Sequence, residues 1–94
     1  MKNLVWSPTF VRAFKRLVKK NPELCSQLEQ VLQQIAEDPF QLSLRSHKLK
    51  GDLSGRYSSS IDYQNRILFK IVTNTESGEE EILLITLGSH DDVY

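Results

Sequence analysis

A chain of 94 residues has room for one domain, expected to span residues 1–94, and for a thin hydrophobic core. Charged residues make up 26% of it, as in ordinary soluble proteins, and no apolar run approaches the ~18 residues that a membrane span requires. The single cysteine, Cys25, excludes an internal disulfide and fits a reducing compartment, so we expect a cytoplasmic protein without membrane contact.

The formal net charge is zero, but the charges are unevenly distributed along the chain. Residues 1–50 hold nine basic and four acidic side chains, whereas residues 51–94 hold three basic and eight acidic ones. Such asymmetry indicates a surface that faces a polyanion. A folded domain can also mix its two halves in space, so both interpretations stay open.

The first part of the chain predicts a short strand followed by two helices. Residues 4–6 are apolar, and Ser7 with Pro8 then supply an N-cap and a first helical position that needs no N–H. Asn21 with Pro22 repeats this signal, and Pro39 ends the second helix. Apolar residues recur at helical spacing at Phe10, Phe14, Leu17, Val18, and again at Leu24, Leu28, Val31, Leu32, Ile35.

From residue 56 the hydrophobic period changes to that of strands. Residues 56–62, 66–73 and 79–87 read as three strands joined by turns at 63–65 and 74–78. Short turns between consecutive strands predict an antiparallel meander. We therefore expect an α+β domain in which an N-terminal two-helix hairpin packs on one face of a small, mainly antiparallel sheet and leaves the other face open.

Residues 45–56 connect the second helix to the first of these strands. The segment combines His47 with two glycines and with the basic residues Arg45, Lys48, Lys50 and Arg56. Its cationic side chains can hold a phosphate backbone while its leucines anchor it to the domain. A solvated connector is the alternative interpretation.

Two further features are candidates for chemistry. Arg66 opens an otherwise apolar strand, where its planar fork can bind a phosphate or pair with Asp62 or Asp52. The segment 88–94 follows the last strand and holds His90, a residue type that shuttles protons near neutral pH, and Tyr94, which can stack on a base. Without other features, this segment would read as a loose terminus.

Other kinds of site have weaker support. The sequence has no HExxH, no cysteine pair, no P-loop and no GxSxG. His47, His90, Asp91 and Asp92 do not have the spacing of a familiar metal site. We therefore expect neither a metal nor another cofactor.

Three short motifs together resemble the RelE/ParE superfamily of type II toxin–antitoxin toxins, most closely its RelE, YafQ and YoeB branches. They are His47-x-Leu49-x-Gly51-x-Leu53-x-Gly55, then Arg66-Ile67-Leu68-Phe69, then Gly88-Ser89-His90-Asp91-Asp92-Val93-Tyr94. Including Trp6-Ser7 before the first helix, the resemblance covers almost the whole chain.

The resemblance implies a RelE-like fold and an endoribonuclease, an mRNA interferase, that cuts mRNA in the ribosomal A site. It also implies a cognate antitoxin as partner, with operator DNA contacted only through that antitoxin. The implied catalytic residues are His47, Arg66, His90 and Tyr94, and the implied RNA-binding residues are Arg45, Lys48, Lys50 and Arg56.

In such a site the RNA 2′-OH is the nucleophile, so the enzyme must move protons and neutralise charge without a metal. We expect His47 to be the general base and His90 the general acid, or the reverse, with Arg66 stabilising the phosphorane. The sequence departs from the family pattern at Ser58-Ser59-Ser60, where several relatives carry Arg or His. A ParE-like poison of DNA gyrase and a catalytically inactive partner-binding module are the alternatives.

Overall fold

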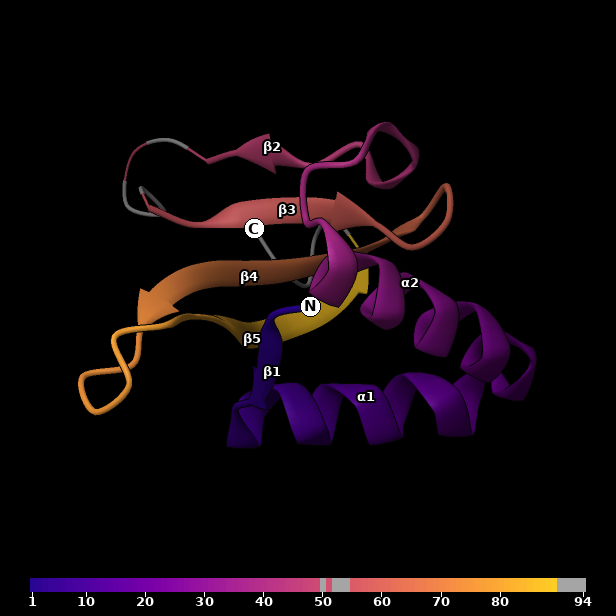
Figure 1. Ribbon diagram of the computed structural model, residues 1–94. Coiled ribbons are helices and arrows are strands. Elements are labelled where there is room, and N and C mark those ends of the chain that lie inside the picture. The colour runs from indigo at the N-terminus through magenta and orange to yellow at the C-terminus, as the bar shows by residue number, and fades with distance from the viewer. Residues whose placement is uncertain (50, 52–54, 90–94) are drawn as a thin grey trace.

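The computed structural model describes residues 1–49, 51 and 55–89, which form two helices and a five-stranded sheet (Figure 1). Both helices pack on one face of the sheet, so the predicted α+β architecture is confirmed. The elements are β1 (Asn3–Trp6), α1 (Pro8–Lys20), the 3₁₀ turn η1 (Pro22–Leu24), α2 (Cys25–Glu37), the 3₁₀ turn η2 (Leu42–Leu44), β2 (His47–Lys48), β3 (Tyr57–Ser60), β4 (Asn65–Thr73) and β5 (Glu80–Ser89).

The strand order across the sheet is β1-β5-β4-β3-β2. Strands β2 to β5 pair antiparallel, as the short connections predict, whereas β1 lies parallel to β5 at the edge. The β1 pairing ends where Trp6 lies opposite Leu84. Among the described residues, no strand covers the β1 side of β5 beyond that point.

Three predicted boundaries are wrong. The segment 45–56 contains a short strand, β2, because His47 pairs with Ser58 and Lys48 with Tyr57. Strand β3 is shorter than predicted and stops at Ser60. Strand β5 continues to Ser89, so the first two residues of the expected terminal segment belong to the sheet. Each difference comes from strand pairing, which hydrophobic periodicity does not record.

Helix α1 begins as the sequence predicts. The Ser7 side chain accepts a hydrogen bond from the Phe10 backbone N–H at 3.0 Å, and Pro8 occupies the first helical position. The Ser7 hydroxyl also donates to the Ile85 carbonyl of β5 at 3.0 Å. One side chain therefore caps the helix and ties it to the sheet.

Replacing Ser7 by alanine is expected to lower the free energy of unfolding by about 1–2 kcal/mol, because an N-cap is lost together with the bond to β5. Urea denaturation followed by circular dichroism measures the change. Ser26→Ala is a suitable control, since Ser26 is an exposed serine of α2. Equal stability of the two variants would contradict the double role of Ser7.

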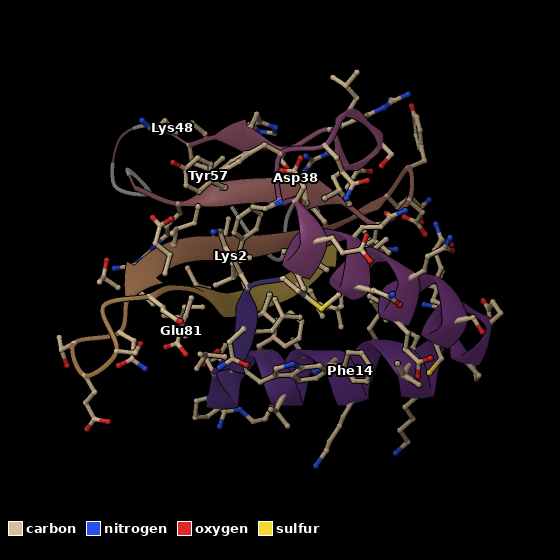
Figure 2. The ribbon with its side chains drawn as sticks, viewed as in Figure 1. Lys2, Phe14, Asp38, Lys48, Tyr57 and Glu81 are labelled. Carbon is tan, nitrogen blue, oxygen red and sulfur yellow. The ribbon has the colours of Figure 1, made fainter. Side chains whose placement is uncertain are left out.

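The hydrophobic core lies between the helices and the sheet. Alternate residues of β4 face it, so Ile67 and Phe69 have no exposed surface. Tyr57 of β3 packs on Phe69 with ring centroids 5.6 Å apart and lies on the helix side of the sheet (Figure 2). The remaining core members are Phe10, Leu28, Val31, Leu32, Ile35, Leu44, Ile61, Ile82, Leu84 and Leu87.

The opposite face of the sheet is not fully open. Ser58 and Leu68 are cross-strand partners on that face, and their exposed fractions are 0% and 2%. The expectation of an open face is therefore wrong at the centre of β3 and β4. His47 belongs to the same row, because it pairs with Ser58 from the other side.

Candidate active site

The strand register brings His47 and Arg66 together on the face of the sheet away from the helices. Ser58 lies between His47 and Leu68, and Arg66 lies two residues before Leu68 in β4. Residues two apart in a strand share a face, so the long Arg66 side chain can cross β3 diagonally. Its Nη2 lies 3.3 Å from Nδ1 of His47.

Arg66 is held in this position by β3 and by the chain before β2. Its Nε donates to the Ser58 hydroxyl at 2.5 Å, and its Nη2 lies 3.2 Å from both the Ser58 and the Arg45 carbonyls. Arg45 presents its carbonyl from a left-handed backbone conformation, with φ of 49°. The guanidinium is therefore oriented before any ligand binds.

The positive charge of Arg66 is not neutralised within the described residues, where the only salt bridge joins Lys2 and Glu80. Pairing with Asp62 is not found, because that carboxylate accepts hydrogen bonds from the Gln64 and Asn65 backbone N–H groups. Asp52 lies outside the described residues. Among the described hydrogen bonds, none uses Nη1 of Arg66, so this side of the guanidinium can accept an anionic ligand.

The contact with Arg66 also determines the tautomer of His47. A guanidinium has only donors, so Nδ1 of His47 must be the acceptor and must carry the lone pair. The neutral ring then bears its hydrogen on Nε2. His47 is exposed on β2, so an incoming ligand can reach the imidazole.

The other predicted RNA-binding residues are placed differently. Lys48 alternates with His47 and pairs with Tyr57, which faces the helices, so it lies on the other face at the outer edge of the sheet (Figure 2). Arg45 contributes its carbonyl to the site, and its side chain is exposed. The Arg56 carbonyl accepts the Leu49 N–H at 2.9 Å and closes the β2–β3 connection. Lys50, His90 and Tyr94 lie outside the described residues.

The serine triplet has three separate structural roles. Ser58 binds Arg66, the Ser59 hydroxyl is hydrogen-bonded to Ser46, and the Ser60 hydroxyl donates to the Asp62 carbonyl. Sequence reasoning missed Ser58 as a partner of Arg66, because the strand pairing that joins them was not known. A register aligned on the two apolar strands would have found it.

Two other kinds of feature were sought among residues 1–49, 51 and 55–89. These residues contain no group of three His, Cys, Asp or Glu side chains placed to hold a metal ion. No helix in the same part of the chain has both the length and the apolar character to cross a membrane.

Known structures share this fold. The YoeB/ParE toxin from Agrobacterium tumefaciens matches with a TM-score of 0.77 and 20% identity over 96% of this chain and 99% of that one. YafQ from E. coli strain BL21(DE3) matches with a TM-score of 0.79 and 12% identity over 100% and 99%. The E. coli DinJ-YafQ toxin-antitoxin complex contains a chain that matches with a TM-score of 0.77 and 14% identity over 99% and 97%.

These identities establish a common fold, and the family comes from the sequence model. No curated protein matches the chain significantly in sequence. The model of the ParE-like toxin of type II bacterial toxin-antitoxin system matches residues 4–94. The match covers the helices, the sheet and all the predicted site residues. The chain therefore belongs to the ParE-like toxins of type II bacterial toxin–antitoxin systems, within the RelE/ParE superfamily.

Proposed function

We propose that this toxin is a ribosome-dependent endoribonuclease that cleaves mRNA by using the RNA 2′-OH as nucleophile. The observation that carries the proposal is the contact between Arg66 and Nδ1 of His47 on an accessible part of the sheet. A cation and an imidazole at hydrogen-bond distance can neutralise a phosphorane and accept a proton from a neighbouring hydroxyl. A protein that only binds another protein has no chemical need for such a pair.

The scissile phosphate would bind first to the Nη1 side of Arg66, which the fold leaves available. As the phosphate draws the guanidinium toward itself, the 3.3 Å contact between Nη2 and Nδ1 of His47 weakens. The lone pair on Nδ1 then becomes available to the 2′-OH. His47 accepts the hydroxyl proton, the 2′-oxygen attacks phosphorus, and the bond to the 5′-oxygen breaks.

The leaving 5′-oxygen requires a proton donor, and we assign this role to His90. Tyr94 would stack on or orient a nucleotide, and Lys48, Lys50, Arg45 and Arg56 would contact RNA phosphates. Acid/base catalysis contributes roughly 10²–10⁴ to the rate for each group. Orientation of mRNA in the ribosomal A site would supply a further large factor.

A cognate antitoxin would keep the toxin inactive and would be its only link to operator DNA. The structural similarity to YafQ, which is known in a complex with DinJ, supports this partner. The antitoxin would bind the sheet edge or face as a strand or helix and mask the segment around His47.

A ParE-like poison of DNA gyrase is the second candidate function, and the name of the matching family favours it. Such a toxin would act by binding gyrase, without cleaving RNA. The same fold can serve both functions, since function depends on the site and not on the architecture.

Induction of the toxin alone is expected to produce discrete breaks within translated mRNAs, visible by primer extension, and no accumulation of gyrase-linked DNA breaks. The reason is that the site offers proton transfer to RNA, whereas DNA lacks the 2′-OH. A parallel culture in which translation is blocked should show intact mRNA. Intact mRNA together with gyrase-linked DNA breaks would reject the endoribonuclease and favour the gyrase poison.

A further inference from the structure

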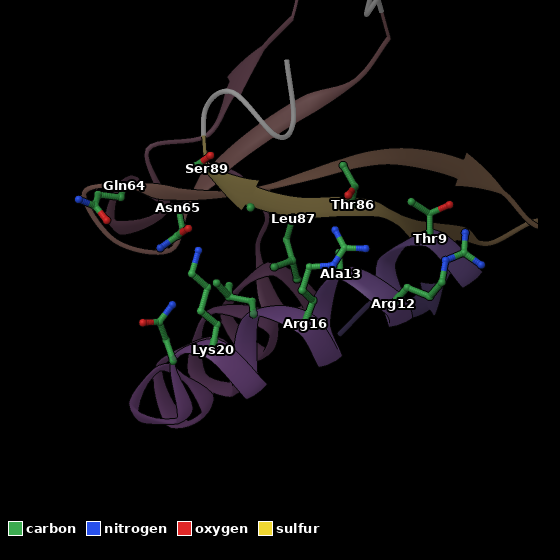
Figure 3. A pocket seen from close by; sticks show the side chains of 13 residues that line it. Thr9, Arg12, Ala13, Arg16, Lys20, Gln64, Asn65, Thr86, Leu87 and Ser89 are labelled. Carbon is green, nitrogen blue, oxygen red and sulfur yellow. The ribbon is translucent and has the colours of Figure 1, made fainter.

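A groove of about 570 Å³ lies between α1 and the end of β5, away from the His47–Arg66 site. Thirteen described residues line it, and three of them, Arg12, Arg16 and Lys20, project from α1 toward the sheet (Figure 3). The opposite wall is formed by residues 86–89 of β5 and by Gln64 and Asn65 at the start of β4. Nothing in the proposed cleavage mechanism uses this groove.

The groove is positively charged. Arg12, Arg16 and Lys20 are spaced four residues apart, so successive cations lie about 6 Å apart along one side of the helix. The described lining contains no acidic residue. Within the described part of the chain, none of the three forms a salt bridge. Three unneutralised cations in a row favour an extended anionic ligand over a single ion.

The opposite wall supplies polar groups that suit phosphates. Thr9, Thr86, Gln64 and Asn65 carry hydroxyl or amide groups, which are ordinary partners of phosphate and sugar oxygens. The strand β1 stops opposite Leu84, so the outer edge of β5 along the groove is not covered by another described strand. Only Ala13, Leu17 and Leu87 are apolar among the described lining residues, which offers a protein partner little to anchor on.

The groove reaches the strand ends that carry the candidate active site. Asn65 lines it and directly precedes Arg66, and Gly88, which also lines it, is the cross-strand partner of Arg66. Arg66 points to the opposite face of the sheet. A nucleotide chain that leaves Arg66 can therefore pass around the end of β4 and β5 into the groove.

We propose that the groove between α1 and β5 binds the phosphodiester backbone of an RNA segment separate from the cleaved bond. The proposal deepens the endoribonuclease function and rests on it for the identity of the ligand as RNA. The segment belongs either to the mRNA that flanks the cleaved position or to ribosomal RNA. Both sources present the same phosphodiester chemistry.

The test uses the whole purified chain, a short fluorescein-labelled 2′-O-methyl oligoribonucleotide and fluorescence anisotropy over a range of salt concentrations. Each lost phosphate contact on a single strand lowers the slope of log K against log salt by about 0.7. Arg16→Gln/Lys20→Gln is therefore expected to lower the slope by about 1.4. Lys15→Gln/Lys19→Gln is the matched control, because it removes the same charge from exposed residues of α1 outside the groove.

Equal slopes for the two double variants, with unchanged circular dichroism spectra, would overturn the proposal. So would polyglutamate binding that shows the same dependence on Arg16 and Lys20 and exceeds RNA binding, because the groove would then suit an acidic protein. A second arm measures binding to 70S ribosomes without mRNA. Loss of affinity there in Arg16→Gln/Lys20→Gln, and not in the control, supports the groove with ribosomal RNA as the source.

The readout separates this proposal from the cleavage proposal. The 2′-O-methyl probe has no free 2′-OH and cannot be cut by the proposed mechanism. A chain that binds the probe through Arg16 and Lys20 but never cleaves mRNA would support the groove and reject the nuclease. A chain that cleaves mRNA while both double variants bind alike would do the reverse.

Discussion

Arg66→Ala is expected to lower the rate of mRNA cleavage by about 10²–10³-fold, as the loss of one preorganised charge donor does in other enzymes. Four hydrogen-bond contacts orient the guanidinium toward Ser58, Arg45 and His47 before substrate binds. Alanine removes both the phosphate contact and the group that holds Nδ1 of His47. The measurement is single-turnover cleavage of mRNA bound in the A site of programmed ribosomes.

Two variants sharpen the Arg66 prediction. Arg66→Lys keeps the positive charge but cannot reproduce the planar fork that reaches Ser58 and His47 together, so most of the loss should remain. Lys70→Ala is the matched control, because Lys70 is exposed on the same face of β4, about 13 Å further along the strand. If Lys70→Ala slowed cleavage as much as Arg66→Ala, only general surface charge would be at work.

Ser58→Ala tests whether orientation of Arg66 matters apart from its charge. The substitution removes the 2.5 Å contact to Nε and leaves the backbone contact of Nη2 with the Ser58 carbonyl in place. We expect cleavage between that of wild type and that of Arg66→Ala. A rate equal to wild type would show that the Ser58 hydroxyl does not position Arg66.

His47→Ala is expected to slow cleavage by about 10²–10⁴-fold, the usual contribution of one acid/base group. Expression of this variant without an antitoxin should therefore no longer arrest growth, provided that the protein accumulates and folds. Growth curves after induction, with immunoblots for protein level, measure the effect. A fully toxic His47→Ala would reject the assignment of the general base.

His47→Asn distinguishes proton transfer from simple positioning of Arg66. The asparagine side chain can place an acceptor near the position of Nδ1 and keep the contact with Nη2 of Arg66, but it cannot take up a proton at neutral pH. If His47 is the base, His47→Asn should be as slow as His47→Ala. Recovery of cleavage in His47→Asn would instead make His47 a positioning residue.

The three chemical roles remain unequal in their structural support. The pairing of His47 with Arg66 rests on described contacts, whereas the proposed acid, His90, and the aromatic Tyr94 lie outside the described residues. The inactive partner-binding module is disfavoured by the orientation of Arg66, since the replaced cations at residues 58–60 leave this guanidinium fully engaged with the site. Discrete mRNA breaks after induction would exclude the inactive module altogether.

Much of the fold could be predicted from local sequence signals. Ser7 and Pro8 begin α1, and the helical spacing of apolar residues predicts which faces of α1 and α2 enter the core. These signals depend only on neighbours within a few residues, so they survive without knowledge of the rest of the chain. The apolar strand around Ile67 and Phe69 was likewise correctly expected at the centre of the sheet.

The contacts that cross the sheet could not be predicted in this way. The pairing of β1 with β5 joins residues close to opposite ends of the chain, and the pairing of β2 with β3 depends on the turn between them. A one-residue change in register would move His47 to the face that Lys48 occupies. The residue types were visible in the sequence, but their faces were not.

The sequence by itself determined the one-domain α+β architecture, the helix boundaries, the family motifs and the identity of His47 and Arg66 as candidate residues. The tertiary structure decided that Arg66 crosses Ser58 to reach Nδ1 of His47, that Lys48 lies on the other face, and that Arg12, Arg16 and Lys20 line a groove beside β5. The physical reason is that helix caps and amphipathic spacing are local properties, whereas the distances between these side chains follow from strand register and from the packing of α1 on β5.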